Sequence, residues 1–450
     1  MDYIVNTPCG PVKGCTGRVA GTVAYKGIRY ATAGRWKYPK QVTAWEGVYD
    51  ATQYGPCAYQ RRAFVDESKT GKHFYHNEFR KGAVYTYSED CLFLNIWTPE
   101  NAKAGDKLPV LFYIHGGSFT GGSGTEKHFD GPVWPREGVI GVTINYRLGP
   151  WGFLTLPELK EEAGCTGNYG LYDQMTAMQW VKDNIPAFGG DAENITIMGQ
   201  SAGAMSVQQH VLSPLTKGLF QKAVMSSGGG VSKMMSTGAP EKNYGFWQAV
   251  MANCGCKTLA QFREVAPETL YDAWQKAKKE VKGAFQACSP CLDGRLVVDT
   301  GVNVLSKNAQ HRIPYMAGST SEDMMPPIIY SMSKNWCKAQ DVPSYCWFFD
   351  RQLPGDKNGA WHSSDLWYWF GTLENSWRPF EEKDRELSDL MVRYLCNFAK
   401  KGNPNGSGNP EWVACGDRAM VMGEKKAHMA KPSTLKQVIT MLTKKGAGEI

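Results

Sequence analysis

The chain has 450 residues, of which 42% are hydrophobic and 21% are charged, and its formal net charge is +7 at pH 7. A chain of this length buries a large core, and because no linker, charge block or internal repeat divides it, we expect one domain over residues 1–450. The positive excess is modest and forms no basic stripe with interleaved aromatic residues, so nucleic-acid binding is not expected.

The N-terminal residues, Met1 to Pro8, contain neither a basic region nor a long apolar run. No stretch further along is long and apolar enough to span a bilayer, which predicts a cytoplasmic protein without a membrane partner. The 13 cysteines agree with this prediction. Most of them lie in core-like contexts, where cysteine behaves as a small hydrophobic residue, and such use is typical of a reducing compartment.

A glycine-rich turn follows the apolar run 108–114, which predicts a buried strand. Consecutive glycines in the turn 115–122 allow a tight bend that directs two N–H groups at one point. We expect the N–H groups of Gly117 and Ser118, together with that of Ala202, to bind an oxyanion; the alternative is a plain glycine turn. No phosphate-binding G-x-x-x-x-G-K-[ST] loop occurs, so no nucleotide cofactor is expected.

The most informative motif is Gly-Gln-Ser-Ala-Gly at 199–203. It follows the predicted strand 194–198 and precedes the predicted helix start 204–210. A serine between two glycines at a strand-to-helix turn is typical of a nucleophile elbow. A motif this short also arises by chance, so its interpretation depends on a base, an acid and an oxyanion hole elsewhere in the chain. Ser201 is the candidate nucleophile.

Residues 240–310 are mostly helical in pattern, with amphipathic stretches at 249–262 and 270–281. Cys288 and Cys291 have C-x-x-C spacing, but neither a second pair nor a nearby histidine accompanies them. A zinc or redox site is therefore not expected, and the sequence predicts neither a metal nor a cofactor.

Two adjacent carboxylates, Glu322 and Asp323, follow a predicted strand that begins near residue 314. A carboxylate after Ser201 in the chain can orient a catalytic imidazole and stabilise its protonated form. We choose Asp323 as the acid and keep Glu322 as the alternative, in which case the other carboxylate is a solvated loop charge.

Four histidines follow the serine motif, at positions 210, 311, 362 and 428. His210 lies inside the helix that follows the motif, and His311 and His428 lie in polar surroundings. His362 lies in a loop between the predicted strand 345–349 and an aromatic helix. A loop after a core strand is the usual place of the base in the order serine, acid, histidine, so His362 is the candidate base.

Together these motifs resemble those of type-B carboxylesterases of the cholinesterase-like family, in particular bacterial para-nitrobenzyl-esterase-like members. Further matches run along nearly the whole chain: Gly27–Ala31, Glu89–Ile96, Asn145–Gly149, Gly167–Gln174, Phe188–Asp191 and Asn397–Asn405. The resemblance implies the α/β-hydrolase fold, in which a mostly parallel central sheet is flanked by helices and helical insertions, here about 240–310, wall the active-site gorge. The strand and helix spacing independently favours alternating β and α elements.

The resemblance also assigns roles to residues outside the motifs. Arg147 with Asp173, and Arg35 with Glu89, match family positions that form structural ion pairs. Cys57 and Cys91 match the first family disulfide, whereas the expected partner position for a second one holds Phe262, which argues against an oxidised framework.

This chain departs from the family pattern at three positions near the expected site. Gln200 replaces a common glutamate, Asp323 occupies a position that is usually glutamate, and Lys81 stands where choline-binding relatives have tryptophan. A choline ester is therefore not expected as substrate.

The resemblance implies two-step acyl transfer, in which Ser201 attacks an ester carbonyl with His362 as base. Phe119 and Trp361 flank the oxyanion turn and the base, so we expect them in an apolar pocket for a small-molecule partner, an uncharged short-chain or aryl ester. Amides, lactones or carbamates are alternative substrates for the same triad, and a non-catalytic binding member of the fold is a second alternative. The sequence carries no signal for an oligomeric state.

Overall fold

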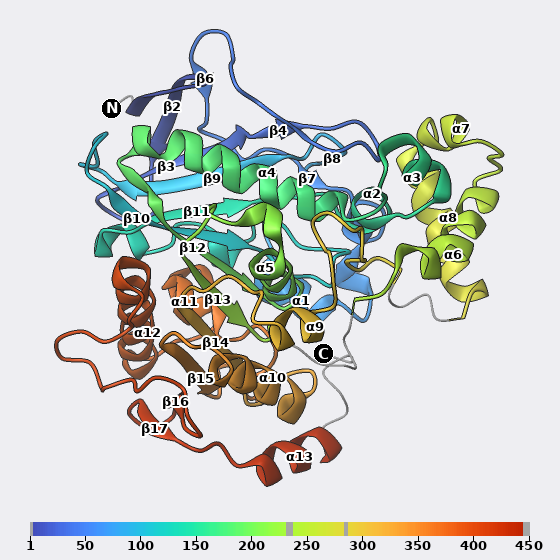
Figure 1. Ribbon diagram of the computed structural model, residues 1–450. Coiled ribbons are helices and arrows are strands. Elements are labelled where there is room, and N and C mark those ends of the chain that lie inside the picture. The colour runs from blue at the N-terminus through green and yellow to red at the C-terminus, as the bar shows by residue number, and fades with distance from the viewer. Residues whose placement is uncertain (1–2, 231–236, 283–286, 444–450) are drawn as a thin grey trace.

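The computed structural model describes residues 3–230, 237–282 and 287–443. Within these residues, one sheet of 13 strands has the order β1-β2-β3-β9-β11-β10-β12-β13-β14-β15-β16-β17, with β6 beside β2 (Figure 1). Its strands are β1 (Tyr3–Thr7), β2 (Gly10–Thr16), β3 (Thr22–Arg29), β6 (Tyr49–Asp50), β9 (Phe93–Pro99), β10 (Leu108–Ile114), β11 (Ile140–Ile144), β12 (Gly190–Gln200), β13 (Lys222–Ser226), β14 (Tyr315–Thr320), β15 (Ser344–Asp350), β16 (Ala419–Gly423) and β17 (His428–Ala430). Two further sheets have two strands each. One pairs β4 (Ala31–Thr32) with β5 (Lys40–Gln41), and the other pairs β7 (Cys57–Ala58) with β8 (Tyr87–Ser88).

The centre of the sheet is parallel from β11 to β16, and the antiparallel pairs lie toward its two edges. The residues of β11, β13 and β14 are all buried. Parallel strands that are covered on both faces carry continuous apolar runs, and this is the pattern of the runs at 108–114 and 194–198. The prediction of a mostly parallel central sheet is confirmed.

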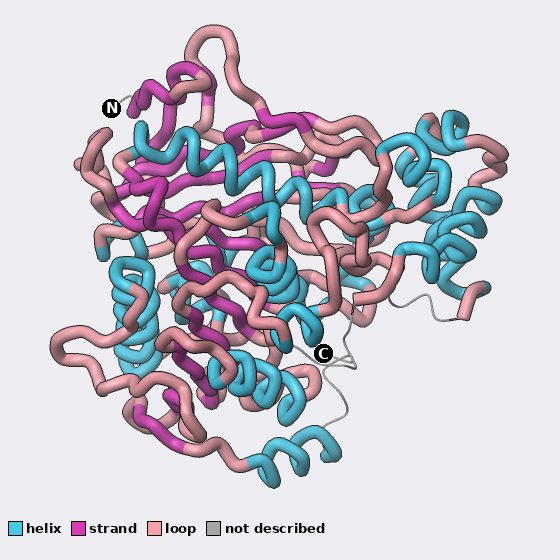
Figure 2. The backbone as a smooth tube through the Cα atoms, in the orientation of Figure 1, coloured by secondary structure: helices cyan, strands magenta, loops and turns pink. Residues whose placement is uncertain are grey.

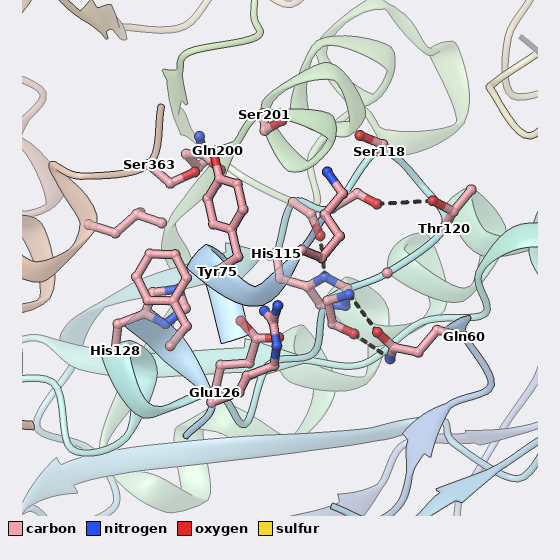
Figure 3. A pocket seen from close by; sticks show the side chains of 18 of the residues that line it. Gln60, Tyr75, His115, Ser118, Thr120, Glu126, His128, Gln200, Ser201 and Ser363 are labelled. Atoms are coloured by element: carbon pink, nitrogen blue, oxygen red, sulfur yellow. Dashed lines mark hydrogen bonds and ion pairs between the residues drawn. The ribbon is translucent and has the colours of Figure 1, made fainter. Parts of the chain in front are cut away.

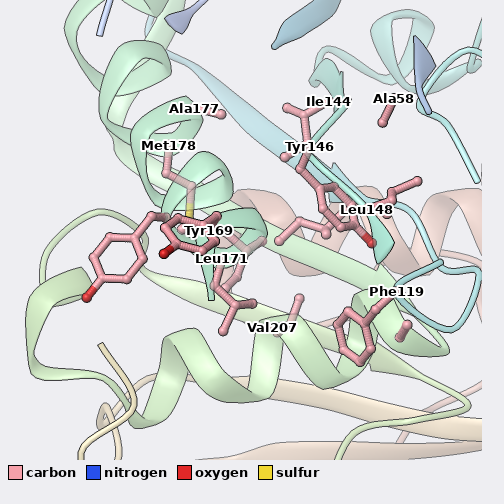
Figure 4. Packing of buried hydrophobic residues seen from close by; sticks show 14 of the residues in the cluster. Ala58, Phe119, Ile144, Tyr146, Leu148, Tyr169, Leu171, Ala177, Met178 and Val207 are labelled. Carbon is pink, nitrogen blue, oxygen red and sulfur yellow. The ribbon is translucent and has the colours of Figure 1, made fainter. Parts of the chain in front are cut away.

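Alternate residues of the central strands enter two separate hydrophobic cores. Val110 and Phe112 belong to the first core, and Leu111 and Tyr113 to the second, because successive side chains of a strand point to opposite faces. The first core includes side chains of α4 (Tyr169–Asn184), α5 (Ala202–Leu212) and α10 (Pro326–Lys338), some of which are drawn in Figure 4. The second includes side chains of α11 (Leu366–Phe370) and α12 (Glu382–Lys401). Figure 2 shows the resulting layers of helix and strand.

Of the helices of the 240–310 region, α6, α7 and α8 gather near α2 and α3 at one end of the molecule, whereas α9 contacts α5 (Figure 1). Their bounds, together with those of the remaining helices, are α1 (His73–Phe79), α2 (Gly149–Phe153), α3 (Pro157–Ala163), α6 (Tyr244–Asn253), α7 (Leu259–Arg263), α8 (Pro267–Glu280), α9 (Gly301–Ser306) and α13 (Thr434–Thr443). Among the described residues, no helix has the length and apolarity needed to cross a membrane.

Candidate active site

Ser201 lies in the tight turn that joins β12 to α5. Its backbone angles are φ 56° and ψ −126°, in a region that residues other than glycine rarely adopt. The Ser201 N–H donates to the carbonyl of Ser226 (2.9 Å), and the Ser201 carbonyl accepts from the N–H of Met205 (3.0 Å). These bonds hold the strained backbone in place, and the serine lies in the wall of a cavity.

The glycines on either side of Gln200-Ser201-Ala202 are required by packing. A Cβ atom at Gly199 would lie 2.3 Å from the backbone of Gly203, and one at Gly203 would lie 2.0 Å from the Ile114 carbonyl oxygen. Both clashes involve backbone atoms, which have no rotamer through which to move away. Strand, helix and the end of β10 therefore approach closely only because neither position has a side chain.

The turn after β10 has left-handed backbone at three successive positions: Gly117 (φ 111°), Ser118 (φ 55°) and Phe119 (φ 59°). Within the described part of the chain, the N–H groups of Gly117 and Ser118 donate to no protein acceptor. The N–H of Ala202, at the first position of α5, is free by helix geometry. Gly117, Ser118 and Ser201 line the same cavity, so unpaired donors lie near the serine.

His362 lies in the loop between β15 and α11 and contacts Asp323, which follows β14. The two side chains meet at 2.6 Å, Nδ1 to Oδ1, and both residues are buried. Asp323 Oδ1 also accepts from the Met324 N–H (2.9 Å). Burial raises the pKa of Asp323, but its interactions with His362 and Met324 outweigh this effect and lower its pKa below the ordinary value. The carboxylate is therefore ionised and holds the imidazole in one orientation.

Glu322, the alternative acid, faces a different part of the structure. Its N–H donates to the Ala360 carbonyl (3.1 Å), and its carboxylate lies where a Cβ atom of Gly359 would be, 2.2 Å away. It lines a separate cavity of about 110 Å³ that also includes Asp350 and Lys436. Adjacent residues after a strand point in opposite directions, and the structure brings Asp323 rather than Glu322 to His362.

The partner of His362 Nε2 is Gln200. The amide nitrogen of Gln200 lies 3.2 Å from His362 Nε2. Since Nδ1 is engaged with Asp323, Nε2 carries the lone pair and the amide donates to it. Among the described residues, Ser201 Oγ makes no hydrogen bond to the histidine. Catalytic hydrogen bonds often form or tighten only when substrate binds.

The cavity beside Ser201 has a volume of about 290 Å³. Figure 3 shows Ser201 and Ser118 at one side of it, His115 and Tyr75 in the middle, and Glu126 on the far side in that view. Other lining residues come from the segment 60–80, which includes α1, and none of the described residues of 240–310 is among them. Among the described helices of this region, α8 contacts α6 and α2, and α9 contacts α5. That helices of 240–310 wall the gorge stays a prediction.

Phe119 and Trp361, which we expected in the substrate pocket, lie behind its wall. The Phe119 ring packs against Phe153 with centroids 5.0 Å apart, and the residue is 3% exposed. Trp361 is 1% exposed and packs against Tyr75 and Phe79, both of which line the cavity. Left-handed backbone at Phe119 accompanies a side chain in the core, and the α1 rings stand between Trp361 and the cavity.

The described lining combines a mostly apolar surface with several charged side chains, which the sequence did not lead us to expect. It includes His115 and His128 besides His362, and burial lowers the pKa of His115 to about 4 and that of His128 to about 3. Burial raises the pKa of Glu126, but Arg62 and Arg80 beside it reverse that effect and bring it down to about 2. The charged residues come from the segment 60–80 and from Glu126, and no local pattern in the sequence indicated that these two regions meet.

The two ion pairs implied by the family resemblance are present as contacts. Arg147 and Asp173 form a bidentate ion pair, with Nε 2.8 Å from Oδ2 and Nη2 2.7 Å from Oδ1, and both side chains are buried. Arg35 binds Glu89 through Nε (2.9 Å) and Nη2, and Glu89 is 29% exposed. Cys57 and Cys91 are both free thiols. Within the described residues, no group of three His, Cys, Asp or Glu side chains is arranged to hold a metal.

A parallel sheet, a serine in a strained strand-to-helix turn, and a carboxylate and histidine supplied in that chain order by later strand ends define an α/β-hydrolase. The chain matches the model of the Carboxylesterase family over residues 1–342 and 327–439, and it belongs to this family.

Two curated relatives and one solved structure illustrate the similarity. Para-nitrobenzyl esterase of Bacillus subtilis (strain 168) is 37% identical over 327 residues, which cover 71% of this chain and 63% of that protein. Bile salt-activated lipase of Mus musculus is 30% identical over 481 residues, covering 86% of this chain and 76% of that protein. The solved structure of a thermophilic PNB esterase superposes with a TM-score of 0.83 and 28% identity, covering 97% of this chain and 99% of the other.

Proposed function

We propose that this protein is a serine carboxylesterase with Ser201 as nucleophile, His362 as general base and acid, and Asp323 as the residue that orients the histidine. The observation that carries the proposal is the 2.6 Å contact between His362 and Asp323 at the cavity that Ser201 also lines. A serine hydroxyl is a weak nucleophile at its free pKa, so it needs an adjacent base, and the base needs a partner that fixes its tautomer.

The reaction has two steps. His362 Nε2 accepts the proton of Ser201 Oγ as this oxygen attacks the ester carbonyl carbon. The N–H groups of Gly117, Ser118 and Ala202 bind the oxyanion of the tetrahedral intermediate. The intermediate collapses, the alcohol leaves with the proton held by His362, and an acyl-serine remains. Water then loses a proton to His362, attacks the acyl group and releases the acid, and the proton returns to Ser201 Oγ.

Gln200 fits this scheme as a temporary partner of the histidine. Its amide donates to Nε2 before the reaction and has to release that nitrogen for Ser201. The names of two family relatives, para-nitrobenzyl esterase and bile salt-activated lipase, refer to ester-cleaving enzymes and support an ester as substrate. We also infer that residues 1–450 act as one catalytic unit, since strands from residue 3 to residue 430 join one sheet.

Labelling with a fluorophosphonate probe, followed by peptide mapping, tests the proposal. We expect the label on Ser201, together with turnover of p-nitrophenyl acetate and butyrate. Ser201→Ala should lose the label and reduce turnover by several orders of magnitude, because the nucleophile is removed while the fold remains. Wild-type turnover in Ser201→Ala would refute the assignment. A folded wild-type protein with neither label nor turnover would favour a non-catalytic binding member of the family.

A further inference from the structure

Four cationic side chains in the described lining of the cavity come from one short segment. Arg61 and Arg62 belong to the 3-10 turn Arg61–Ala63, Lys72 precedes α1, and Arg80 follows it. Two carboxylates, those of Glu67 and Glu126, line the cavity with them. We call Arg61, Arg62, Lys72 and Arg80 the cationic wall. It has more positive than negative groups, although the cavity also holds a proposed nucleophile that reacts with neutral carbonyl groups.

Arg62 is the buried member of the cationic wall. Its side chain is 6% exposed, and its Nη1 donates to Glu126 Oε1 at 2.5 Å. Its Nε and Nη2 are buried without a hydrogen-bond partner among the described residues. A guanidinium has five N–H donors, and buried donors without an acceptor are costly. The guanidinium also lies over the Tyr85 ring, 4.9 Å from its centroid, so a ligand oxygen that satisfied these donors would have to enter beside that ring.

The two carboxylates are engaged by two of the cations. Glu126 contacts both Arg62 and Arg80, and Glu67 binds Arg80 at 2.9 Å. Arg61 and Lys72 are exposed at the cavity and have no carboxylate partner within the described residues. The cationic wall therefore retains two uncompensated charges as well as the free donors of Arg62.

Ser201 and the cationic wall line the same cavity. In Figure 3, Glu126, which binds Arg62, lies beyond His115 and Tyr75 from Ser201. A cavity of about 290 Å³ admits a small substrate whose ester group is at the serine and whose remaining part extends toward the wall. Cations in a cleft of low dielectric attract anions strongly, and a carboxylate matches the donor geometry of a guanidinium.

We propose, on the basis of the proposed ester hydrolysis, that the substrate is a small ester that carries a free carboxylate, which the cationic wall binds while Ser201 attacks the ester carbonyl. This class replaces the uncharged esters expected from the sequence. The carboxylate belongs to either the acyl or the alcohol portion, and the experiment distinguishes these two sources.

Rates on two matched ester pairs test the proposal with the full chain. Monoethyl adipate against its amide analogue, ethyl adipamate, places the charge on the acyl side. The pair 4-acetoxybenzoate and 4-acetoxybenzamide places it on the leaving group. Within each pair only the carboxylate and amide differ. In at least one pair we expect kcat/KM for the anion to exceed that of the amide roughly ten- to a hundredfold, as for a charge-assisted hydrogen bond. Raising NaCl from about 0.02 to about 0.5 M should reduce that ratio, because Arg61 and Lys72 are exposed.

Variants assign the preference to the cationic wall. Arg61→Gln and Lys72→Gln, singly and combined, remove charges without disturbing the buried Arg62–Glu126 pair, and each should lower the anion-to-amide ratio several-fold. Arg62→Lys keeps the charge but loses the planar guanidinium that can donate two hydrogen bonds to one carboxylate. This variant should also lower the anion-to-amide ratio. The matched control is Lys69→Gln, which removes an equal charge from the same segment at a residue whose side chain is 83% exposed and outside the described lining. The control should retain the wild-type ratio.

The outcomes separate this inference from the proposed function. A ratio of one or less in both pairs, with the amide esters hydrolysed and Ser201 labelled, refutes the carboxylate proposal and leaves the esterase assignment intact. A high ratio that neither salt nor the wall variants change refutes the role of the cationic wall. Absence of both label and hydrolysis on all four esters refutes the proposed function itself.

Discussion

At the scale of single residues, the site depends on which of two neighbouring carboxylates reaches the histidine. Asp323 contacts His362 at 2.6 Å, and Glu322 turns toward Gly359. The two side chains differ by one methylene and one position in the chain, so composition and spacing alone left both as candidates. The direction of the chain as it leaves β14 decides between them.

Asp323→Asn should reduce kcat on p-nitrophenyl acetate by roughly 10³–10⁴-fold, because an amide stabilises neither the required tautomer nor the imidazolium. Initial rates, with folding checked by circular dichroism, measure this effect. Glu322→Gln is the matched control and should retain activity within a few-fold. A larger loss in Glu322→Gln than in Asp323→Asn would exchange the roles of the two residues.

At the scale of elements, the strand-to-helix turn forms because Gly199 and Gly203 have no side chains. Gly203 is the second residue of α5 and meets the end of β10 through backbone atoms alone. Gly245 is likewise the second residue of its helix, α6, but a Cβ atom there has nothing within 4 Å and the backbone is not left-handed. The same substitution at these two positions therefore separates packing from helix propensity.

Gly203→Ala should destabilise the protein by about 1–3 kcal/mol, because the new methyl group forces the helix away from the Ile114 carbonyl. The displacement should also reduce ester hydrolysis by at least about tenfold, since it moves the proposed nucleophile Ser201 relative to the proposed base His362. Gly245→Ala should be neutral or stabilising by up to about 1 kcal/mol. Thermal midpoints and kcat/KM provide the measurements, and equal behaviour of the two variants would show that the close approach at Gly203 has no energetic consequence.

The segment 60–80 is the second element that shapes the site. Two of its aromatic residues, Tyr75 and Phe79, line the cavity. Its charged residues were not assigned a role from the sequence. They matter because α1 and the preceding turns place them beside Glu126, which lies 64 positions after Arg62.

At the scale of the whole molecule, buried histidines of lowered pKa couple stability to pH, and His115 and His128 are two of them. The pKa values of His115 and His128 are lowered from 6.5 to about 4 and about 3, mainly by burial. The unfolded chain takes up protons at both residues as the pH falls below 6.5, whereas the folded chain stays neutral there until the lower values. Stability is therefore full above the unfolded pKa and is lost as the pH falls toward the folded values.

Denaturant titrations from about pH 7 to about pH 5 test this coupling, in which each histidine contributes a slope of ~1.4 kcal/mol per pH unit below its unfolded pKa. His128→Leu removes one proton-binding site. It should therefore lower the slope of the free energy of unfolding against pH by ~1.4 kcal/mol per pH unit. His428→Leu, at an exposed position of β17, is the control and should leave the slope as in the wild type. Parallel curves for wild type and His128→Leu would contradict the coupling.

The sequence by itself determined the features that depend on neighbours along the chain. The apolar runs at 108–114 and 194–198 predicted strands, and the spacing of strand-like and helical stretches predicted a mostly parallel sheet. The glycines of 199–203 predicted a close strand-to-helix turn, and the order of serine, carboxylate and histidine predicted the fold class. These properties follow from local backbone sterics and side-chain periodicity, which act over a few residues.

Only the tertiary structure decided which distant side chains share the cavity. Phe119 and Trp361 are near the site in sequence but lie behind its wall, and Arg62 meets Glu126 across 64 positions. Such contacts depend on how whole elements pack against one another, and a side chain's direction changes with a small rotation of its backbone. Residues that are neighbours in the sequence do not determine that rotation. The serine motif is therefore recognisable from the chain, whereas the charge of the cavity beside it is not.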